Sequence, residues 1–432
     1  MQSTNLRLGH FREVLRKRRN ELAILGIAVT ARVLAALIRV TFGIRTLPFL
    51  PGTIAFSDFF SVNGPQLKDL ALGLIPYSNF GYWYTPLFLY AIYPFYILGG
   101  MEGATIPILA TDAATAVLVY LLVRTRSSDK IALIAGATYA LSPFVLYEEG
   151  YLLLSSQPML FFLLLSIYCL IAKKPLSASI LFGISVLFKQ EALFVLPAYI
   201  AWYLVKYREI AWKGLLLFAG VVAIACLPFL LLSPAAFLAD TSYGIIPLKA
   251  GSNLVTTSNV SFESVTSSLL KTCSSLIPTS NLWSSFVACG ATYSWSPPTI
   301  LDRLSILTEV IIWAIKAAEL ELLVVLGAIL YFSRRRSNFL PLFSAYSLVA
   351  FLILFSYTVH LLLSYYFLPV YALLLASATT KNSAIFLIII SAVSILIPDG
   401  TSQTVLFSIF GILFLLLIPD AQLLPRNEIV IS

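Results

Sequence analysis

The chain is a succession of apolar runs, most of them near the roughly 20 residues of a membrane-crossing helix, separated by short clusters of Lys and Arg. Hydrophobic residues make up 59% of its 432 residues and charged residues 11%, whereas a typical soluble domain has about 25% charged residues. This composition excludes a soluble enzyme, a disordered chain and a nucleic-acid-binding domain. It predicts an all-α polytopic membrane protein whose main solvent is lipid.

The positions of the basic residues predict how the chain crosses the membrane, because inner loops of membrane proteins collect Lys and Arg. The net charge is +8 and the densest basic cluster runs from Arg12 to Arg19, so we expect a cytoplasmic N-terminus. The apolar stretch 84–98 is short for a span and contains Pro86 and Pro94. Placing it at the outer surface as a juxtamembrane segment puts the later basic loops inside. Both termini are then cytoplasmic, and the first helix, which lacks a cleavage site, stays as an anchor.

We predict about 12 transmembrane helices, over 21–41, 105–123, 131–147, 151–172, 176–188, 191–205, 214–232, 310–332, 338–358, 361–378, 383–398 and 404–419. The predicted organisation is an N-terminal module over 1–232 with juxtamembrane helices in its first outer loop, 42–104, then an outer Ser/Thr-rich segment over 233–305 and C-terminal helices over 306–432. Cys273 and Cys289 share the outer segment, and the sequence leaves open whether they form a disulfide.

Charged residues within or beside the apolar runs are rare, and each is a candidate for function. Asp58 follows the first helix among aromatic residues, which suits a general base, although Asp also caps turns. Asp112 and Arg32 have comparable depths in their predicted helices. We therefore expect these two side chains to face each other, either as a structural ion pair or in direct support of a site.

The outer ends of the predicted helices hold a second group of candidates. Lys189 stands in a short outer turn, against the charge rule, where it suits binding of a lipid phosphate or snorkelling to the surface. His360 suits donation to a phosphate or a structural hydrogen bond. Glu148 and Glu149 suit contact with an acceptor or plain solvation. Tyr84 and the aromatic residues around it suit stacking on a sugar or anchoring at the membrane interface.

Motifs for common cofactors are missing from the sequence. It has no Walker loop, no Rossmann glycine fingerprint and no Cys or His spacing typical of zinc. Only two His residues occur, one of them in the N-terminal tail, so no Ser–His–Asp order is supported. We therefore expect no cofactor and no metal, with any chemistry at the outer membrane face.

The order of several motifs resembles that of integral-membrane glycosyltransferases of the GT-C fold, which use polyprenyl-phosphate sugars. The chain is most similar to the catalytic subunit of the first GPI mannosyltransferase and its prokaryotic relatives. The matching motifs read Ser57-Asp58-Phe59, Gly73-Leu74-Ile75-Pro76-Tyr77, Tyr84-Thr85-Pro86-Leu87, Asp112, Phe188-Lys189 with Leu196-Pro197, and Val359-His360 with Tyr366 and Pro369.

This resemblance implies transfer of a mannose-like hexose from a polyprenyl-phosphate donor to a lipid, glycan or protein acceptor, with inversion and without a metal. It implies that Asp58 is the base and that Lys189 and His360 hold the donor phosphate. The implied pocket for sugar and acceptor contains Tyr77, Tyr84, Tyr366, Glu148 and Glu149, with Asp112 and Arg32 in support.

Two departures from the family pattern leave the sugar and the acceptor open. Phe60 replaces the second acid of the usual Asp-x-Asp, and Ser155-Ser156-Gln157 stands where mannosyltransferases have Asn-x-Asp. The alternatives are a polytopic transporter or lipid-linked-sugar flippase, and a non-catalytic subunit of a glycosylation complex. The chain lacks a visible internal repeat of the kind common in carriers. We favour a prokaryotic cell membrane over that of the endoplasmic reticulum.

Overall fold

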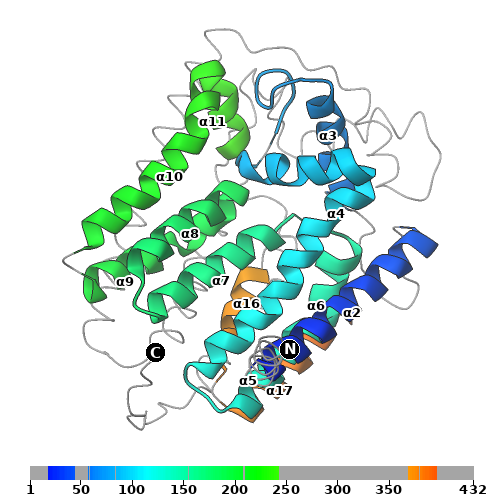
Figure 1. Cartoon of the computed structure of the whole chain (residues 1–432), viewed down its shortest axis with the longest axis vertical. Coiled ribbons are helices and arrows are strands. Elements are labelled where there is room, and N and C mark those ends of the chain that lie inside the picture. The colour runs from blue at the N-terminus through cyan, green and yellow to red at the C-terminus, as the bar shows by residue number, and fades with distance from the viewer. Residues whose placement is uncertain are drawn as a thin grey trace, which may run out of the picture.

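The structure of the protein, a computed structural model, describes residues 18–43, 57, 59–82, 84–153, 155–207, 210–242, 368–378 and 380–396. Within these ranges the chain is a packing of helices with no β-strand (Figure 1). Four helical stretches there are long and apolar enough to cross a membrane, namely Arg19–Phe42, Leu87–Arg124, Asp129–Tyr151 and Ala211–Leu232. The described residues thus agree with the predicted all-α class, and their four long apolar helices are typical of a membrane protein, while the total of twelve spans stays a prediction.

In chain order the described elements are α2 (Arg19–Phe42), η1 (Phe59–Asn63), α3 (Gly64–Ala71), α4 (Leu87–Arg124), α5 (Asp129–Leu141), α6 (Pro143–Val145), η2 (Leu146–Tyr151), α7 (Gln157–Ile171), α8 (Pro175–Phe188), η3 (Gln190–Val195), α9 (Leu196–Lys206), α10 (Ala211–Leu232), α11 (Pro234–Ser242), α16 (Leu368–Ala376) and α17 (Lys381–Leu396). The predictions that lie outside the described residues are the helices 310–332, 338–358 and 404–419, and the residues Asp58, His360, Tyr366, Cys273 and Cys289.

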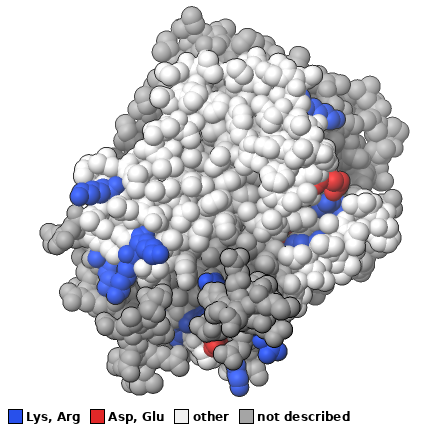
Figure 2. All heavy atoms as spheres, in the orientation of Figure 1, with Lys and Arg blue, Asp and Glu red and all other residues white. Residues whose placement is uncertain are grey.

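Helix α2 buries one narrow stripe, spaced three and four residues apart, against α4 and α5: Ile24, Ala28, Arg32, Ala35 and Arg39. Its other faces carry exposed apolar side chains, with Leu34 58% and Val40 64% exposed. Figure 2 shows a broad uncharged middle on one face of the molecule, with most of its Lys and Arg toward the lower left and the bottom. An uncharged surface of this kind, together with the exposed apolar side chains of α2, suits contact with lipid rather than water.

Helix α4 contains a break at Gly99 and Gly100, where the backbone leaves helical geometry. Gly100 has a φ of +62°, a left-handed conformation that glycine adopts without a Cβ penalty. The helix changes direction in this region (Figure 1). The two sides of the break correspond to the predicted juxtamembrane stretch 84–98 and the predicted helix 105–123.

The region between α5 and α7 differs most from the prediction. The predicted helix 131–147 is interrupted at Pro143, and the chain continues as a π-helical turn, η2, to Tyr151. The next helix begins at Gln157 instead of residue 151, because Leu153 adopts a left-handed φ of +56° that ends regular helix. The prediction for the start of this helix is therefore wrong.

The predicted helices 176–188 and 214–232 are confirmed by α8 and α10. The predicted helix 191–205 begins as the 3-10 turn η3 before it continues as α9. Helices α16 and α17 fall within the predicted 361–378 and nearly within 383–398. Helix α11 lies at the start of the segment 233–305, which is predicted as an outer Ser/Thr-rich region.

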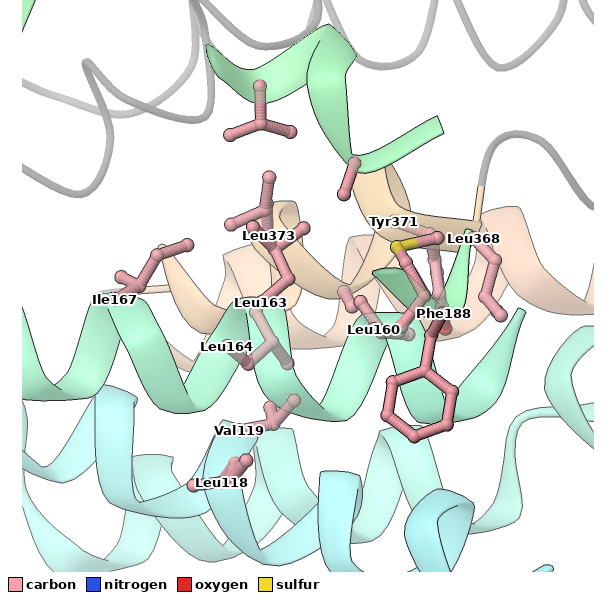
Figure 3. Packing of buried hydrophobic residues seen from close by; sticks show 14 of the residues in the cluster. Leu118, Val119, Leu160, Leu163, Leu164, Ile167, Phe188, Leu368, Tyr371 and Leu373 are labelled. Atoms are coloured by element: carbon pink, nitrogen blue, oxygen red, sulfur yellow. The ribbon is translucent and has the colours of Figure 1, made fainter. Parts of the chain in front are cut away.

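The core is formed by α7, which packs against α4 and α8 and receives α16 from the C-terminal part of the chain. Figure 3 shows Leu163 and Leu164 of α7 near Val119 of α4, with Leu373 of α16 on the other side. Phe188, at the end of α8, lies beside this layer. The core therefore holds the end of α8 in place, and with it Lys189, the residue that follows this helix.

Candidate functional site

A buried ion pair joins α2 to α4. The guanidinium of Arg32 donates through Nε to Asp112 Oδ2 at 2.7 Å and through Nη2 to Asp112 Oδ1 at 3.0 Å. Nη1 of Arg32 donates to the carbonyl of Ala140, and the hydroxyl of Tyr139 lies 3.2 Å from Asp112 Oδ1. Arg32 and Asp112 thus form the pair that their shared depth predicts, with both charges saturated by partners within the protein.

The hydroxyl of Tyr139 continues this network to the start of α7. It lies 3.2 Å from Oε1 of Gln157 as well as 3.2 Å from Asp112. Gln157 is the first residue of α7, and the residue before it, Ser156, accepts a hydrogen bond from Lys189. Polar side chains therefore lead from the ion pair on α2 and α4 to the lysine at the end of α8.

Lys189 is fully buried, which contradicts the snorkelling alternative. Its Nζ donates to Ser156 Oγ at 3.0 Å and lies 3.0 Å from Glu191 Oε1. The same ammonium lies 5.0 Å from the centre of the Tyr84 ring, a cation–π arrangement. Because Ser156 immediately precedes α7, the ammonium adjoins the positive end of that helix dipole.

The turn before Tyr84 is tied down at several points. Tyr77 adopts a left-handed φ of +64°, a strained conformation for a bulky residue. Its hydroxyl donates to the Tyr84 carbonyl at 2.5 Å, and Thr85 Oγ1 donates to the Val186 carbonyl of α8 at 2.7 Å. Burial raises the pKa of Tyr77 well above its ordinary value, so its phenol stays neutral. Tyr77 therefore positions Tyr84 over the end of α8.

Glu148 and Glu149 lie in the π-helical turn η2, and both are buried, which contradicts the solvation alternative. π-Helical turns occur frequently at functional sites. Glu149 interacts electrostatically with Asp112, Lys189 and Glu191. Among the described residues, neither oxygen of its carboxylate has a hydrogen-bond partner. This carboxylate thus differs from that of Asp112, which is fully bonded.

Two charged residues near the site were not predicted. Arg39 is 3% exposed and donates to Gly150 O at 3.2 Å and to Glu102 Oε2 at 2.9 Å. Its spacing of seven from Arg32 on one helix face was the signal available in the sequence. Asp240 of α11 accepts the backbone N–H of Tyr82 at 2.9 Å. Burial raises its pKa to about 7.

The structure brings together six of the predicted residues, directly or through intervening partners. Arg32 contacts Asp112, Lys189 contacts Tyr84, and Tyr77 contacts Tyr84 through its carbonyl. Glu149 interacts electrostatically with Lys189 and Asp112. Sequence reasoning did not single out Tyr139 or Glu191, which complete these contacts. Within the described part of the chain, no group of three or more His, Cys, Asp or Glu residues is arranged to hold a metal ion.

Comparisons of the chain with protein-family models, with curated proteins and with solved structures gave no match.

Proposed function

We propose that this protein is a membrane glycosyltransferase that moves a mannose-like hexose from a polyprenyl-phosphate donor to an acceptor hydroxyl at the outer or lumenal membrane face. The observation that carries the proposal is the setting of Lys189. This lysine is buried, lies against Tyr84 and Ser156, and adjoins the start of α7. A lipid-borne phosphate is the kind of group that such a cation suits.

Glu191 explains how a charged lysine can be stable when no donor is bound. Its carboxylate holds the ammonium at 3.0 Å, and its side chain is 10% exposed. A phosphate oxygen is also an anionic acceptor, so it can take over this contact from Glu191. The Tyr84 ring covers another side of the ammonium and offers a flat aromatic surface next to the phosphate position.

In the proposed reaction Asp58 accepts the proton of the acceptor hydroxyl, and the acceptor oxygen attacks the anomeric carbon. The bond from that carbon to the phosphate oxygen breaks, and polyprenyl phosphate leaves with the electron pair. Lys189, together with His360, stabilises the charge that grows on the phosphate, an effect strengthened away from bulk water. The direct displacement inverts the configuration of the sugar.

The test is a transfer assay on the purified full-length protein. Radiolabelled polyprenyl-phosphate mannose and polyprenyl-phosphate glucose are supplied separately, with a membrane lipid extract as the acceptor. We expect the wild-type protein to move label to a new product, and Asp58→Asn to lose this transfer while keeping its fold. Asp69→Asn, a change in the same outer region, serves as the matched control.

A different outcome would identify another class. In vesicles, wild-type protein that carries labelled lipid from one leaflet to the other, with no transfer to an acceptor, would support a flippase and overturn the enzyme. Equal transfer by the wild type and Asp58→Asn would remove Asp58 from the reaction.

A further inference from the structure

We infer that Glu149, Gln157 and Ser155 form a binding site for the sugar hydroxyls of the donor, beside the phosphate position at Lys189. This inference rests on the proposed function and adds to it the residues that recognise the sugar. The three side chains are 0%, 0% and 1% exposed. In the described part of the chain, both Glu149 oxygens, Gln157 Nε2 and Ser155 Oγ have no hydrogen-bond partner.

Buried polar atoms without partners are costly, and a buried carboxylate is the most costly of them. Unpaired polar atoms stay buried in a protein when a ligand that binds during function forms hydrogen bonds with them. Sugar hydroxyls are suitable partners because each one donates a hydrogen bond and also accepts one. A carboxylate beside an amide and a hydroxyl matches a ring that carries neighbouring hydroxyl groups.

The orientation of Gln157 strengthens this assignment. The Tyr139 hydroxyl has a single hydrogen, but two acceptors, Asp112 Oδ1 and Gln157 Oε1, both lie 3.2 Å from it. Exchanging the oxygen and nitrogen of the Gln157 amide removes this conflict, since Nε2 then donates to Tyr139 while the Tyr139 hydroxyl donates to Asp112. The amide oxygen then takes the position without a partner. The unpartnered atoms become carboxylate, amide and hydroxyl oxygens, which a hydroxyl-rich ligand can satisfy.

The two residues Lys189 and Glu149 determine how the ligand is oriented in the site. Lys189 attracts an anionic group, while Glu149, which interacts electrostatically with this lysine, is fully buried and suits a neutral, hydroxyl-bearing group. A ligand that fits both residues has a phosphate next to a neutral, hydroxyl-bearing part. A sugar joined to a lipid phosphate has this arrangement. Lys189 therefore binds the phosphate, and Glu149 binds the hydroxyls.

Tyr139 connects this site to the ion pair and holds Gln157 in place. It bonds to both Asp112 and Gln157 and also interacts electrostatically with Glu149. Because the Arg32–Asp112 pair is rigidly bonded, the amide of Gln157 has a fixed position. A preorganised amide loses little conformational freedom when a ligand binds.

The test compares two ligands that differ only in the sugar. Purified full-length protein in detergent is titrated with polyprenyl phosphate and with polyprenyl-phosphate mannose. We expect Glu149→Gln to weaken binding of the sugar-bearing lipid about 10-fold, the range for one or two lost hydrogen bonds. Binding of polyprenyl phosphate should stay within about twofold of wild type, because this lipid carries no sugar hydroxyls to bond Glu149.

Two further variants complete the design. Glu102→Gln changes a carboxylate whose side chain is 59% exposed and should affect neither ligand. Ser155→Ala should weaken only the sugar-bearing lipid, by a smaller factor, and it tests the site independently if Glu149→Gln fails to fold.

The results distinguish failure of this inference from failure of the proposed function. Equal loss for both lipids, or no loss for either, in a folded Glu149→Gln protein would overturn the hydroxyl-binding site while the proposed function stands. Wild-type protein that binds neither lipid would overturn the proposed function, and this inference with it.

Discussion

Two regions of this molecule bury charged groups in different ways. Between α2 and α4, Asp112 accepts two hydrogen bonds from Arg32 and lies within bonding distance of Tyr139. In η2, Glu149 is as deeply buried as Asp112 but has no hydrogen-bond partner among the described residues. The carboxylate of the first region has its hydrogen-bond partners within the protein, whereas that of the second has oxygens that a ligand can bind.

The difference separates a structural role from a functional one. A saturated pair holds two helices at a fixed position and has no acceptor left for a substrate. An unsatisfied carboxylate near a buried lysine costs folding energy, which selection tolerates where a function requires it. Asp240 is intermediate, because it accepts one backbone N–H and has no ion-pair partner in the described part of the chain.

The largest expected effect comes from breaking the saturated pair. Asp112→Asn leaves the Arg32 guanidinium buried without a counter-charge and should lower the free energy of unfolding by about 3–5 kcal/mol. Reversible unfolding in mixed detergent micelles measures this loss. The double variant Arg32→Met with Asp112→Leu removes both charges and should recover most of the stability. A stable Asp112→Asn protein that has lost transfer would instead assign Asp112 a direct role.

The second prediction concerns the region around Glu149 and its neighbour Lys189. Lys189→Met should reduce kcat/KM for transfer by about 10²- to 10³-fold, as expected for removal of one group that stabilises transition-state charge. Lys206→Met, at the exposed end of α9, is the control and should leave transfer unchanged. Because Lys189→Met also strands Glu191, the variant is repeated with Glu191→Gln. Unchanged transfer in a folded Lys189→Met protein would show that Lys189 is structural.

The sequence was sufficient to predict features that depend on length and charge. The helices α2, α8 and α10 follow from runs of apolar residues, and the Arg32–Asp112 contact follows from matching depth in the two predicted helices. The unusual lysine was visible because it broke the charge rule. Each of these signals comes from a short stretch of sequence or from the position of a residue along a predicted helix.

The remaining features depend on packing between distant segments. The bond from the Tyr82 backbone to Asp240 joins residues 158 positions apart, and nothing near either residue indicates it. Tyr139 resembles any other aromatic residue of an apolar helix until Asp112 and Gln157 are placed beside it. The burial of Glu149 depends on the π-helical geometry of η2, which hydrophobic periodicity does not predict.

The third prediction uses Asp240 as the intermediate case. Its pKa is raised from 3.8 to about 7 in the folded protein, so the folded state holds the proton more strongly than the unfolded state. Stability is therefore greatest at low pH and falls as the pH rises toward 7. Between pH 5 and 7 this residue should lower the free energy of unfolding by about 2 kcal/mol.

Asp240→Asn keeps an oxygen for the Tyr82 N–H but cannot ionise. Its unfolding free energy, measured in the same mixed micelles, should lose this part of the pH dependence and should exceed that of the wild type at pH 8. The same slope between pH 5 and 7 in both proteins would show that another group titrates there.

The smallest expected effect concerns a more exposed ion pair between α2 and α4. Arg124 of α4 lies 3.0 Å from Glu21 of α2 and 3.1 Å from Asp129, but its side chain is 43% exposed. Solvent screens this contact, so Arg124→Gln should lower the free energy of unfolding by less than about 1 kcal/mol. High salt should remove the difference. Since Arg124 joins the same two helices as Arg32, a loss as large as that of Asp112→Asn would mean that position between α2 and α4, rather than burial, decides what an ion pair contributes.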